Sequence, residues 1–286
     1  MTPTDPVVAR IQLGLLLRSL RMGRNIATMA AGRVIGMSNA TISRVETGKQ
    51  GIKQEDLITL IDHYRAGESA VAEVLRLHAA TKGRRRGNPY LDTVPHWFRR
   101  FLAMEAEATH IAIYENEVVT GLLQTDAYAR MLMQARTPEA SRTEIDRQVE
   151  QRMERQEVLA EGPHLEVIML ETVLHRVIGD DEIMAGQLKK LAWLSMRGNV
   201  DLRIIPFRPV PTQDDDEAFV VPRGFTLLRL PEQGTLLYLE DFNGAIYPEE
   251  LPVIQQYNHA FDRLRKAAAD VETSREMITT MQKEYE

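Results

Sequence analysis

Apolar residues recur at helical spacing over much of the first 81 residues of the chain. In residues 7–22 they stand at Ile11, Leu15, Leu16 and Leu20, the stripe of an amphipathic helix. The same period predicts helices over residues 54–64 and 68–81, which Gly67 separates. The expected core positions of these two helices are Leu57, Leu60, Ile61 and Leu75. The pattern predicts an all-α, five-helix N-terminal domain over residues 1–81.

Residues 28–48 predict two short helices joined by a tight turn. Gly36 supplies the turn, because a residue without a Cβ enters the φ > 0 region freely. Ser38 follows as an N-cap, its hydroxyl able to accept a hydrogen bond from a free backbone N–H one turn on. The second helix covers residues 39–47, and Gly48 ends it.

The second of these helices has distinct inner and outer faces. Ile42 and Val45 lie three residues apart and point inward. The outer face is left with Asn39, Ala40, Ser43 and Arg44. A helix built in this way fits the DNA major groove, and the competing interpretation is a pair of packing helices with no nucleic-acid role.

A basic, glycine-containing segment follows the helical region. Four cations stand among the glycines of residues 82–87, so we expect a flexible linker over residues 82–95. One interpretation is a tether that adds phosphate contacts through Arg84, Arg85 and Arg86. The other is a solvated hinge, and both can hold together.

From residue 96 onward, short apolar runs rich in strand-forming residues alternate with helical patterns. Strands are expected over residues 110–114, 165–170, 202–207, 225–230 and 235–240, the last two as a hairpin. The tail is helical, with an apolar stripe that starts at Leu251 and includes Phe261. These patterns predict an α/β domain over residues 96–286, with a mixed sheet, flanking helices and long helices at its end.

Composition and charge narrow the expected compartment and the expected class of protein. Absence of cysteine excludes disulfides and thiolate zinc sites, and a cytoplasmic location is expected, since no signal peptide or membrane-spanning apolar run is seen. The net charge of −6 combines unequal parts, since residues 1–87 hold 14 Lys and Arg against 7 Asp and Glu. A basic module on an acidic body is typical of a DNA-binding regulator, although charged faces are also simply solvated.

Motifs for catalysis are missing from the sequence. There is no HxxxH or HxH spacing, no GxSxG elbow, no Walker loop and no GxGxxG. We therefore expect no enzyme, no metal and no cofactor.

The ISRVETGK run, Ile42 to Lys49, carries a resemblance to a known family. Residues 10–65 resemble the Xre/Cro/C1-type helix-turn-helix domain of phage repressors. That resemblance implies an ion pair between Arg21 and Glu46, which would fix the second helix. It implies base contacts from Asn39, Ala40, Thr41, Ser43 and Arg44, and phosphate contacts from Thr28, Ser38, Lys49 and Lys53.

The rest of the chain carries a second resemblance. The runs GLLQTDAYAR, RMERQEVL and MLETVLHRVIG resemble the C-terminal domain of unknown function of antitoxin-like, Scr-type regulators of high-GC soil bacteria. One departure is Thr120, where that family usually has proline. If polar residues of these runs converge, they line an effector pocket; otherwise they cap helices and satisfy buried backbone. The set is Glu105, Gln124, Tyr128, Arg152, Arg155, Gln156 and Glu171.

The sequence thus predicts a sequence-specific transcriptional regulator of double-stranded DNA. It is expected to bind a palindromic operator as a homodimer, without a membrane, and to sense a small partner protein or a small-molecule effector. The alternative is an antitoxin-like protein that binds a small partner, with DNA binding for autoregulation.

Overall fold

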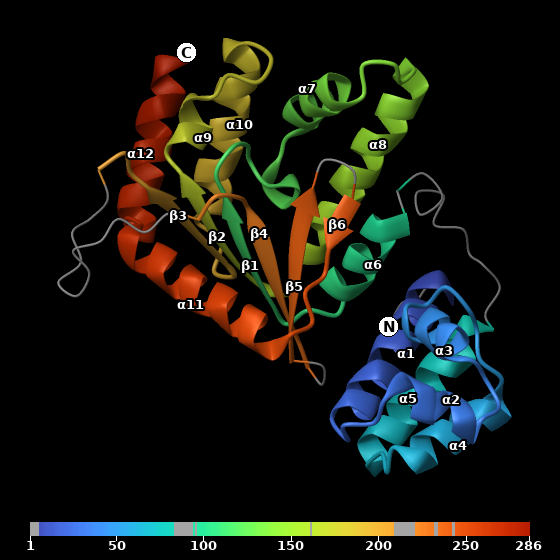
Figure 1. Cartoon of the computed structure of the whole chain (residues 1–286). Helices are drawn as coiled ribbons and strands as arrows, with labels where there is room; N and C mark the ends of the chain where they lie inside the picture. Colours follow the sequence, from blue (N-terminus) through green and yellow to red (C-terminus); the bar gives the residue numbers. More distant parts are fainter. Residues whose placement is uncertain are drawn as a thin grey trace. The chain divides into compact units, whose positions relative to one another are not determined.

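A computed structural model describes residues 6–82, 94, 96–160, 162–208, 221–231, 234–241 and 244–286. The chain divides into two compact units, Met1–Met104 and Glu105–Glu286. The predicted fold class is confirmed: a helical N-terminal part precedes a domain with a mixed sheet and helices (Figure 1). Residues 84–86 and nearly all of the expected linker lie outside the described residues, so the domain limits stay a prediction.

Five helices form the part of the first unit that we call the head. They are α1 (Pro6–Met22), α2 (Thr28–Val34), α3 (Asn39–Glu46), α4 (Gln54–His63) and α5 (Glu68–Thr81). Their shared core holds Leu57, Leu60 and Ile61 as predicted. The prediction for Leu75 is wrong, because its side chain is 37% exposed while Val74 and Leu77 are buried. Leu75 lies one residue, or about 100°, around the helix from Val74 and so leaves the inward stripe.

The remaining elements begin with α6 (His96–Glu105), at whose end the second unit starts. The helices of the second unit are η1 (Gly121–Leu123), α7 (Asp126–Arg136), α8 (Arg142–Arg155), η2 (Gln156–Leu159), α9 (Thr172–His175), α10 (Asp181–Leu194), α11 (Leu251–Ala267) and α12 (Val271–Glu284). Its strands are β1 (His110–Glu115), β2 (His164–Leu170), β3 (Val200–Ile205), β4 (Phe225–Leu230), β5 (Gly234–Asp241) and β6 (Gly244–Ile246). The sequence patterns had not indicated β6.

The sheet has the strand order β3-β2-β1-β4-β5-β6. β1, β2 and β3 pair in parallel, whereas β4 is antiparallel to β1 and β5 is antiparallel to β4. As a result β1, β2, β3 and β5 all end at the same edge of the sheet. Ligands of α/β sheets commonly bind outside this carboxyl edge.

One face of the sheet packs against α11. Ala112 and Tyr114 of β1 and Leu237 and Leu239 of β5 share a buried cluster with Phe261 of α11. Because side chains alternate along a strand, Glu115, Tyr238 and Glu240 point to the opposite face. On that basis the polar ends of β1 and β5 face away from α11.

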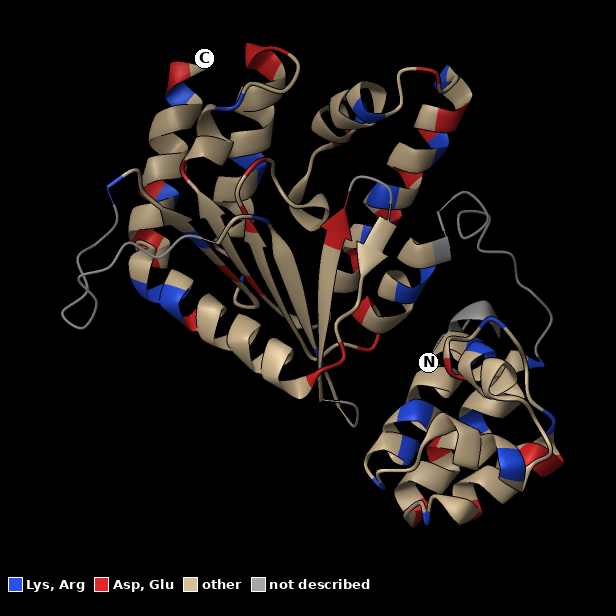
Figure 2. Cartoon of the chain, in the orientation of Figure 1, with Lys and Arg blue, Asp and Glu red and all other residues tan. Residues whose placement is uncertain are grey.

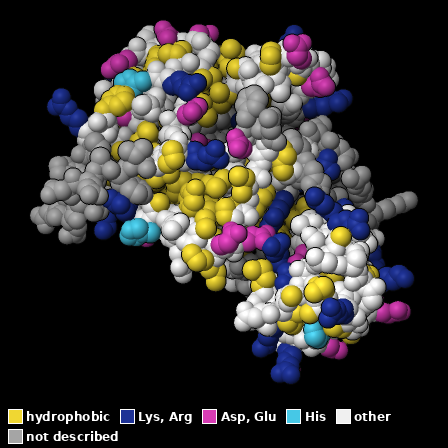
Figure 3. Space-filling view, in the orientation of Figure 1, with side chains coloured by type: hydrophobic (Ala, Val, Ile, Leu, Met, Phe, Trp, Pro, Cys, Tyr) yellow, Lys and Arg dark blue, Asp and Glu magenta, His cyan; other side chains and the backbone are white. Residues whose placement is uncertain are grey.

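The tail helices depart from the predicted stripe at their start. Leu251 is 70% exposed, because it is the first residue of α11 and lies off the inward face, which starts with Val253 and Ile254 packed on the cluster. Arg265 of α11 forms an ion pair with the buried Glu166 of β2, which ties the helix to the sheet. Figure 3 shows hydrophobic side chains gathered on the face that α11 crosses.

Charged residues lie mainly on the helices and at strand ends, as Figure 2 shows, with acidic residues where β5 ends. Within the described residues, none of the helices combines the length and the apolar character needed to cross a membrane.

Candidate nucleic-acid interface

The turn before α3 has the geometry that its residues require. Gly36 has a φ of +67°, a conformation that residues with a Cβ rarely adopt. Ser38 is the N-cap of α3, and its Oγ accepts a hydrogen bond of 3.1 Å from the Thr41 backbone N–H. At the other end Gly48 has a φ of +70°, and the Lys49 N–H donates to the Arg44 carbonyl at 2.8 Å. Both ends of the helix are therefore fixed by local hydrogen bonds.

Close packing on α1 fixes the position of α3. Ile42 and Val45 are buried in the head core. A Cβ added to Gly14 of α1 would lie 2.4 Å from the Val45 carbonyl oxygen, so only glycine permits the two backbones to approach this closely. A Cβ on Gly32 would lie 2.4 Å from the Met37 carbonyl oxygen, so Gly32 makes room for the turn. Thus two glycines set where α3 sits.

Arg21 and Glu46 form the ion pair that the resemblance implies. Arg21 Nε and Nη2 donate to Glu46 Oε1 and Oε2 at 2.6 and 2.9 Å. Their side chains are 9% and 3% exposed, and Arg21 Nη1 also donates to the Ile26 carbonyl at 2.6 Å. The Glu46 hydrogen bond, partly opposed by burial, raises the pKa of Arg21. This buried bidentate pair joins the end of α1 to the end of α3 and to the segment before α2.

The outer face of α3 presents most of the expected base-contact residues to solvent. Asn39, Ala40, Ser43 and Arg44 are exposed. Thr41 is half-buried, and its Oγ1 lies 2.9 Å from Ser38 Oγ, so its hydroxyl takes part in capping the helix. The two side chains with base-reading hydrogen-bond groups, Asn39 and Arg44, form no hydrogen bond within the described residues.

The expected phosphate-contact residues surround this face. Ser38, Lys49 and Lys53 are exposed, and Thr28 is half-buried at the start of α2. The hydroxyl of Ser38 already takes part in the cap. Arg84, Arg85 and Arg86 lie outside the described residues.

Several residues that hold the head together were not singled out from the sequence. Arg10 Nε donates to the Gly48 carbonyl at 2.9 Å, and Arg24 donates to the carbonyls of Tyr64 and Arg65 at 3.0 and 2.8 Å. Gly14, which packs on α3, was the one whose role the sequence could have indicated, since a lone glycine in a leucine-rich helix often marks a close packing contact. The arginine contacts span 38 to 41 residues, so local patterns could not reveal them.

In the second unit, six of the seven expected effector residues take part in two groups of hydrogen bonds that both lie beside Gly121. Arg155 forms a bidentate ion pair with Glu105 at 2.6 and 2.7 Å. Arg152 Nη1 donates to Gln124 Oε1 at 2.7 Å, and Gln156 Nε2 donates to the Gln124 carbonyl at 2.8 Å. Gln124 Nε2 and the Tyr128 hydroxyl both bond to the backbone of Val119. The seventh, Glu171, accepts a hydrogen bond from the Phe207 N–H instead.

Two charged groups in this region have shifted pKa values. Burial, followed by the nearby positive charge of Arg155, lowers the pKa of Arg152 to about 10. Burial, followed by the negative charge of Glu240, raises the pKa of Glu115 to about 8. These hydrogen bonds therefore lie in a poorly solvated part of the fold.

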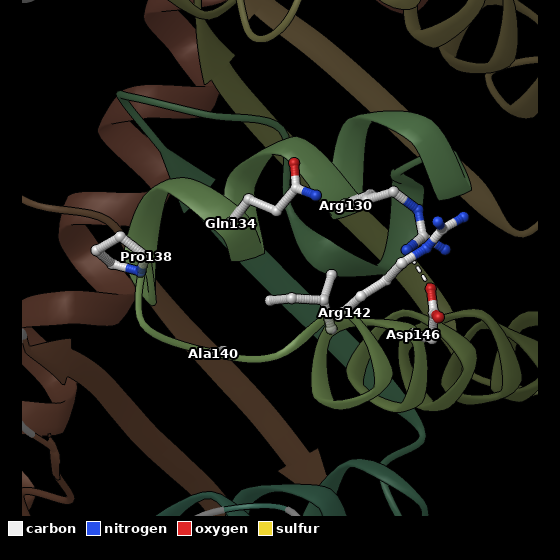
Figure 4. Close-up of a pocket in the computed structure, with 7 residues that line it drawn as sticks. Arg130, Gln134, Pro138, Ala140, Arg142 and Asp146 are labelled. Atoms are coloured by element: carbon white, nitrogen blue, oxygen red, sulfur yellow. Dashed lines mark hydrogen bonds and ion pairs between the residues drawn. The ribbon is translucent and has the colours of Figure 1, made fainter.

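Two hollows in the described part of the second unit are lined by other residues. They adjoin between α7 and α8, have volumes of about 760 and 610 Å³, and share Arg130 and Asp146. Figure 4 shows Arg130 pointing from α7 toward Asp146 of α8, with which it forms an ion pair. No group of three or more His, Asp or Glu side chains in the described residues could hold a metal ion.

Comparison with known families divides the chain as the fold does. A helix-turn-helix domain model matches residues 12–74, and the model of a Domain of unknown function (DUF5753) matches residues 98–280. The chain belongs to the DUF5753 family. No curated protein and no solved structure matches the chain. The helix-turn-helix match supports a DNA-binding regulator, and no catalytic family is among the matches.

Proposed function

We propose that this DUF5753 protein is a sequence-specific transcriptional regulator of the Xre/Cro/C1 type. The supporting observation is the outer face of α3, where Asn39 and Arg44 are exposed on a helix held by a buried ion pair. Arginine can bond bidentately to guanine, and asparagine to adenine. Rigid support matters because base-edge recognition depends on side chains held in fixed positions.

In this proposal, Ala40 offers a methyl contact to thymine, and Thr41 and Ser43 give secondary contacts. Thr28, Ser38, Lys49, Lys53 and Arg84 to Arg86 contact phosphates and set affinity rather than sequence preference. The protein binds as a homodimer, because a single helix-turn-helix usually reads one half of a paired site.

The second unit, in this proposal, receives a signal from a small partner protein or a small-molecule effector. What supports this is the cluster of half-buried cations near Gln124, in which Arg152 bonds to the Gln124 side chain and Arg155 to Glu105 in addition to bonds that satisfy backbone groups. A bound signal changes the fraction of protein that can bind DNA only if it binds the DNA-competent and DNA-incompetent states with different affinities.

DNA binding is tested with the pure protein and its own promoter by fluorescence anisotropy across a salt series. Arg44→Ala and Asn39→Ala should each weaken specific binding about 5-fold to 150-fold while leaving the non-specific affinity nearly unchanged. Arg76→Ala is the matched control, since this exposed arginine lies on α5 and pairs with Glu73.

The proposal is contradicted if Arg44→Ala and Arg76→Ala have the same effect on specific binding. Selection from random DNA extends the test beyond the promoter. If selection yields no preferred site, the antitoxin-like alternative takes the place of the regulator.

A further inference from the structure

Three arginines meet on the side of the sheet away from α11, and in the described part of the chain two of them have a carboxylate partner. Arg155 pairs with Glu105, and Arg136 pairs with Glu240 at 2.7 Å. Among the residues that the structure describes, Arg152 has only the neutral Gln124 side chain as a hydrogen-bond partner. Within the described part of the chain, no carboxylate lies within 4.0 Å of the Arg152 guanidinium.

Lys190 of α10 has a similar environment. Its Nζ donates to the Gln124 carbonyl at 2.7 Å and to Gln156 Oε1 at 2.6 Å, and both of these acceptors are neutral. It too lacks a carboxylate within 4.0 Å among the residues that the structure describes. Burial lowers the pKa of Lys190. Two poorly solvated cations therefore bond to the same glutamine, and neither has a carboxylate within 4.0 Å among the described residues.

Arg152 and its neighbours are only partly covered by the fold. Arg152 and Lys190 are half-buried rather than fully enclosed. Gly121 lies beside the guanidinium: a Cβ added there would be 3.6 Å from Arg152 Cζ. Because glycine has no side chain, the backbone at residue 121 can lie this close to the guanidinium.

Two carboxyl groups, those of Glu240 and Glu115, interact electrostatically with Arg152, and neither forms an ion pair with it. Glu240 is paired with Arg136. Glu115 ends β1 on the same face and is close enough to interact electrostatically with Arg152. It forms no hydrogen bond or ion pair in the described structure, and burial raises its pKa to about 8. At neutral pH its carboxyl group is therefore largely protonated and adds little negative charge beside Arg152.

We propose that Arg152 and Lys190, held on either side of Gln124, bind the oxyanion group of a small ligand, a carboxylate or a phosphate. Charges withdrawn from water are normally paired, and here an external anion would supply the missing partner. A guanidinium donates two parallel hydrogen bonds to either group, and an ammonium adds a compact positive charge. The regulatory role of this site rests on the function proposed above, whereas anion binding itself does not.

The test is thermal unfolding of the full chain, followed by circular dichroism, in inorganic phosphate or in succinate at constant ionic strength. One of the two anions should raise the Tm saturably, by about 3–6 °C at ten times the half-saturating concentration. The anion that acts identifies whether the site takes phosphate or carboxylate.

Arg152→Gln should increase the half-saturating concentration tenfold or more. Lys190→Gln provides a second variant that removes a cation bonded only to neutral groups, and it should also weaken the anion effect. Arg142→Gln is the matched control, because this exposed arginine lies on the same helix in the open hollow between α7 and α8.

The proposal is overturned if neither anion shifts the Tm at concentrations up to about 50 mM, well above ordinary ligand affinities. It is also overturned if Arg152→Gln and Lys190→Gln both retain the response of the wild type and of the control, which would indicate a general salt effect. Promoter binding without added anion is measured separately, so failure of the regulator proposal is distinguished from failure of the anion site.

Discussion

Replacing Glu46 with alanine tests how the recognition helix is held. Arg21 would keep its 2.6 Å hydrogen bond to the Ile26 carbonyl but lose both hydrogen bonds to the carboxylate. With the Arg21 side chain only 9% exposed, water could not fully replace the missing partner. The change therefore leaves an uncompensated charge inside the head.

The size of the effect follows from burial. Exposed ion pairs contribute about 0–1 kcal/mol, whereas removing one partner of a buried pair costs about 3–5 kcal/mol. We expect Glu46→Ala to cost the larger amount, a substantial part of the roughly 5–15 kcal/mol that stabilises a typical domain. The double variant Arg21→Met with Glu46→Leu should recover much of the loss, because it removes both charges.

Native-state hydrogen exchange of the full chain, read by mass spectrometry, measures the loss of stability in the head separately from the rest of the chain. Peptides from α1 and α3 report opening of the head, and peptides from β1 and β2 report the second unit as an internal control. The double-mutant cycle requires both single variants and the pair.

A loss below about 1 kcal/mol for Glu46→Ala would refute the reasoning, since it would show that the pair is solvated in solution. Equal loss of protection in β1 and β2 would show that the head and the second unit unfold together, and the exchange would then not measure the head alone.

Three further changes test other parts of the fold. Ser38→Ala removes the α3 cap and should cost about 1 kcal/mol in the same exchange experiment, and unchanged protection of α3 would contradict that role. Gly48→Ala should cost about 1–2 kcal/mol from its φ of +70° alone, with more from contact with Ile11, while Gly51→Ala, at an open position, serves as control. Glu115 has a folded pKa raised from 4.5 to about 8, so its protonated form stabilises the native state at low pH and this contribution is lost as pH rises through 8. Glu115→Gln should therefore gain stability relative to wild type between pH 4.5 and 8 in urea titrations, and a constant difference over that range would contradict the shift.

The sequence alone determined the local construction of the head. Gly36, Ser38 and Gly48 identified the turn, the cap and the end of α3, because each acts on backbone groups within one helical turn. The helical period also identified Leu57, Leu60 and Ile61 as core residues. It failed at Leu75, since an apolar residue beside the inward stripe looks the same in sequence as one within it.

Alternation of strands and helices likewise predicted a mixed α/β domain, but the pairing of its strands came only from the tertiary structure. β1 lies between β2 and β4, whose residues are separated by more than 50 positions. Such pairings depend on long-range packing, to which local periodicity is insensitive. The short β6 has too few residues to show a period at all.

The tertiary structure also decided which charges are paired. The sequence grouped seven polar residues as one possible pocket. In the structure, Arg155 pairs with Glu105, 50 positions away, whereas among the described residues Arg152 has only Gln124 as a hydrogen-bond partner. Side-chain chemistry identifies an arginine as a candidate for anion binding, but whether a carboxylate reaches it depends on how distant segments fold together. Local hydrogen bonding and periodicity depend on residues that are close together in the sequence. Charge balance in a poorly solvated site depends instead on its three-dimensional surroundings.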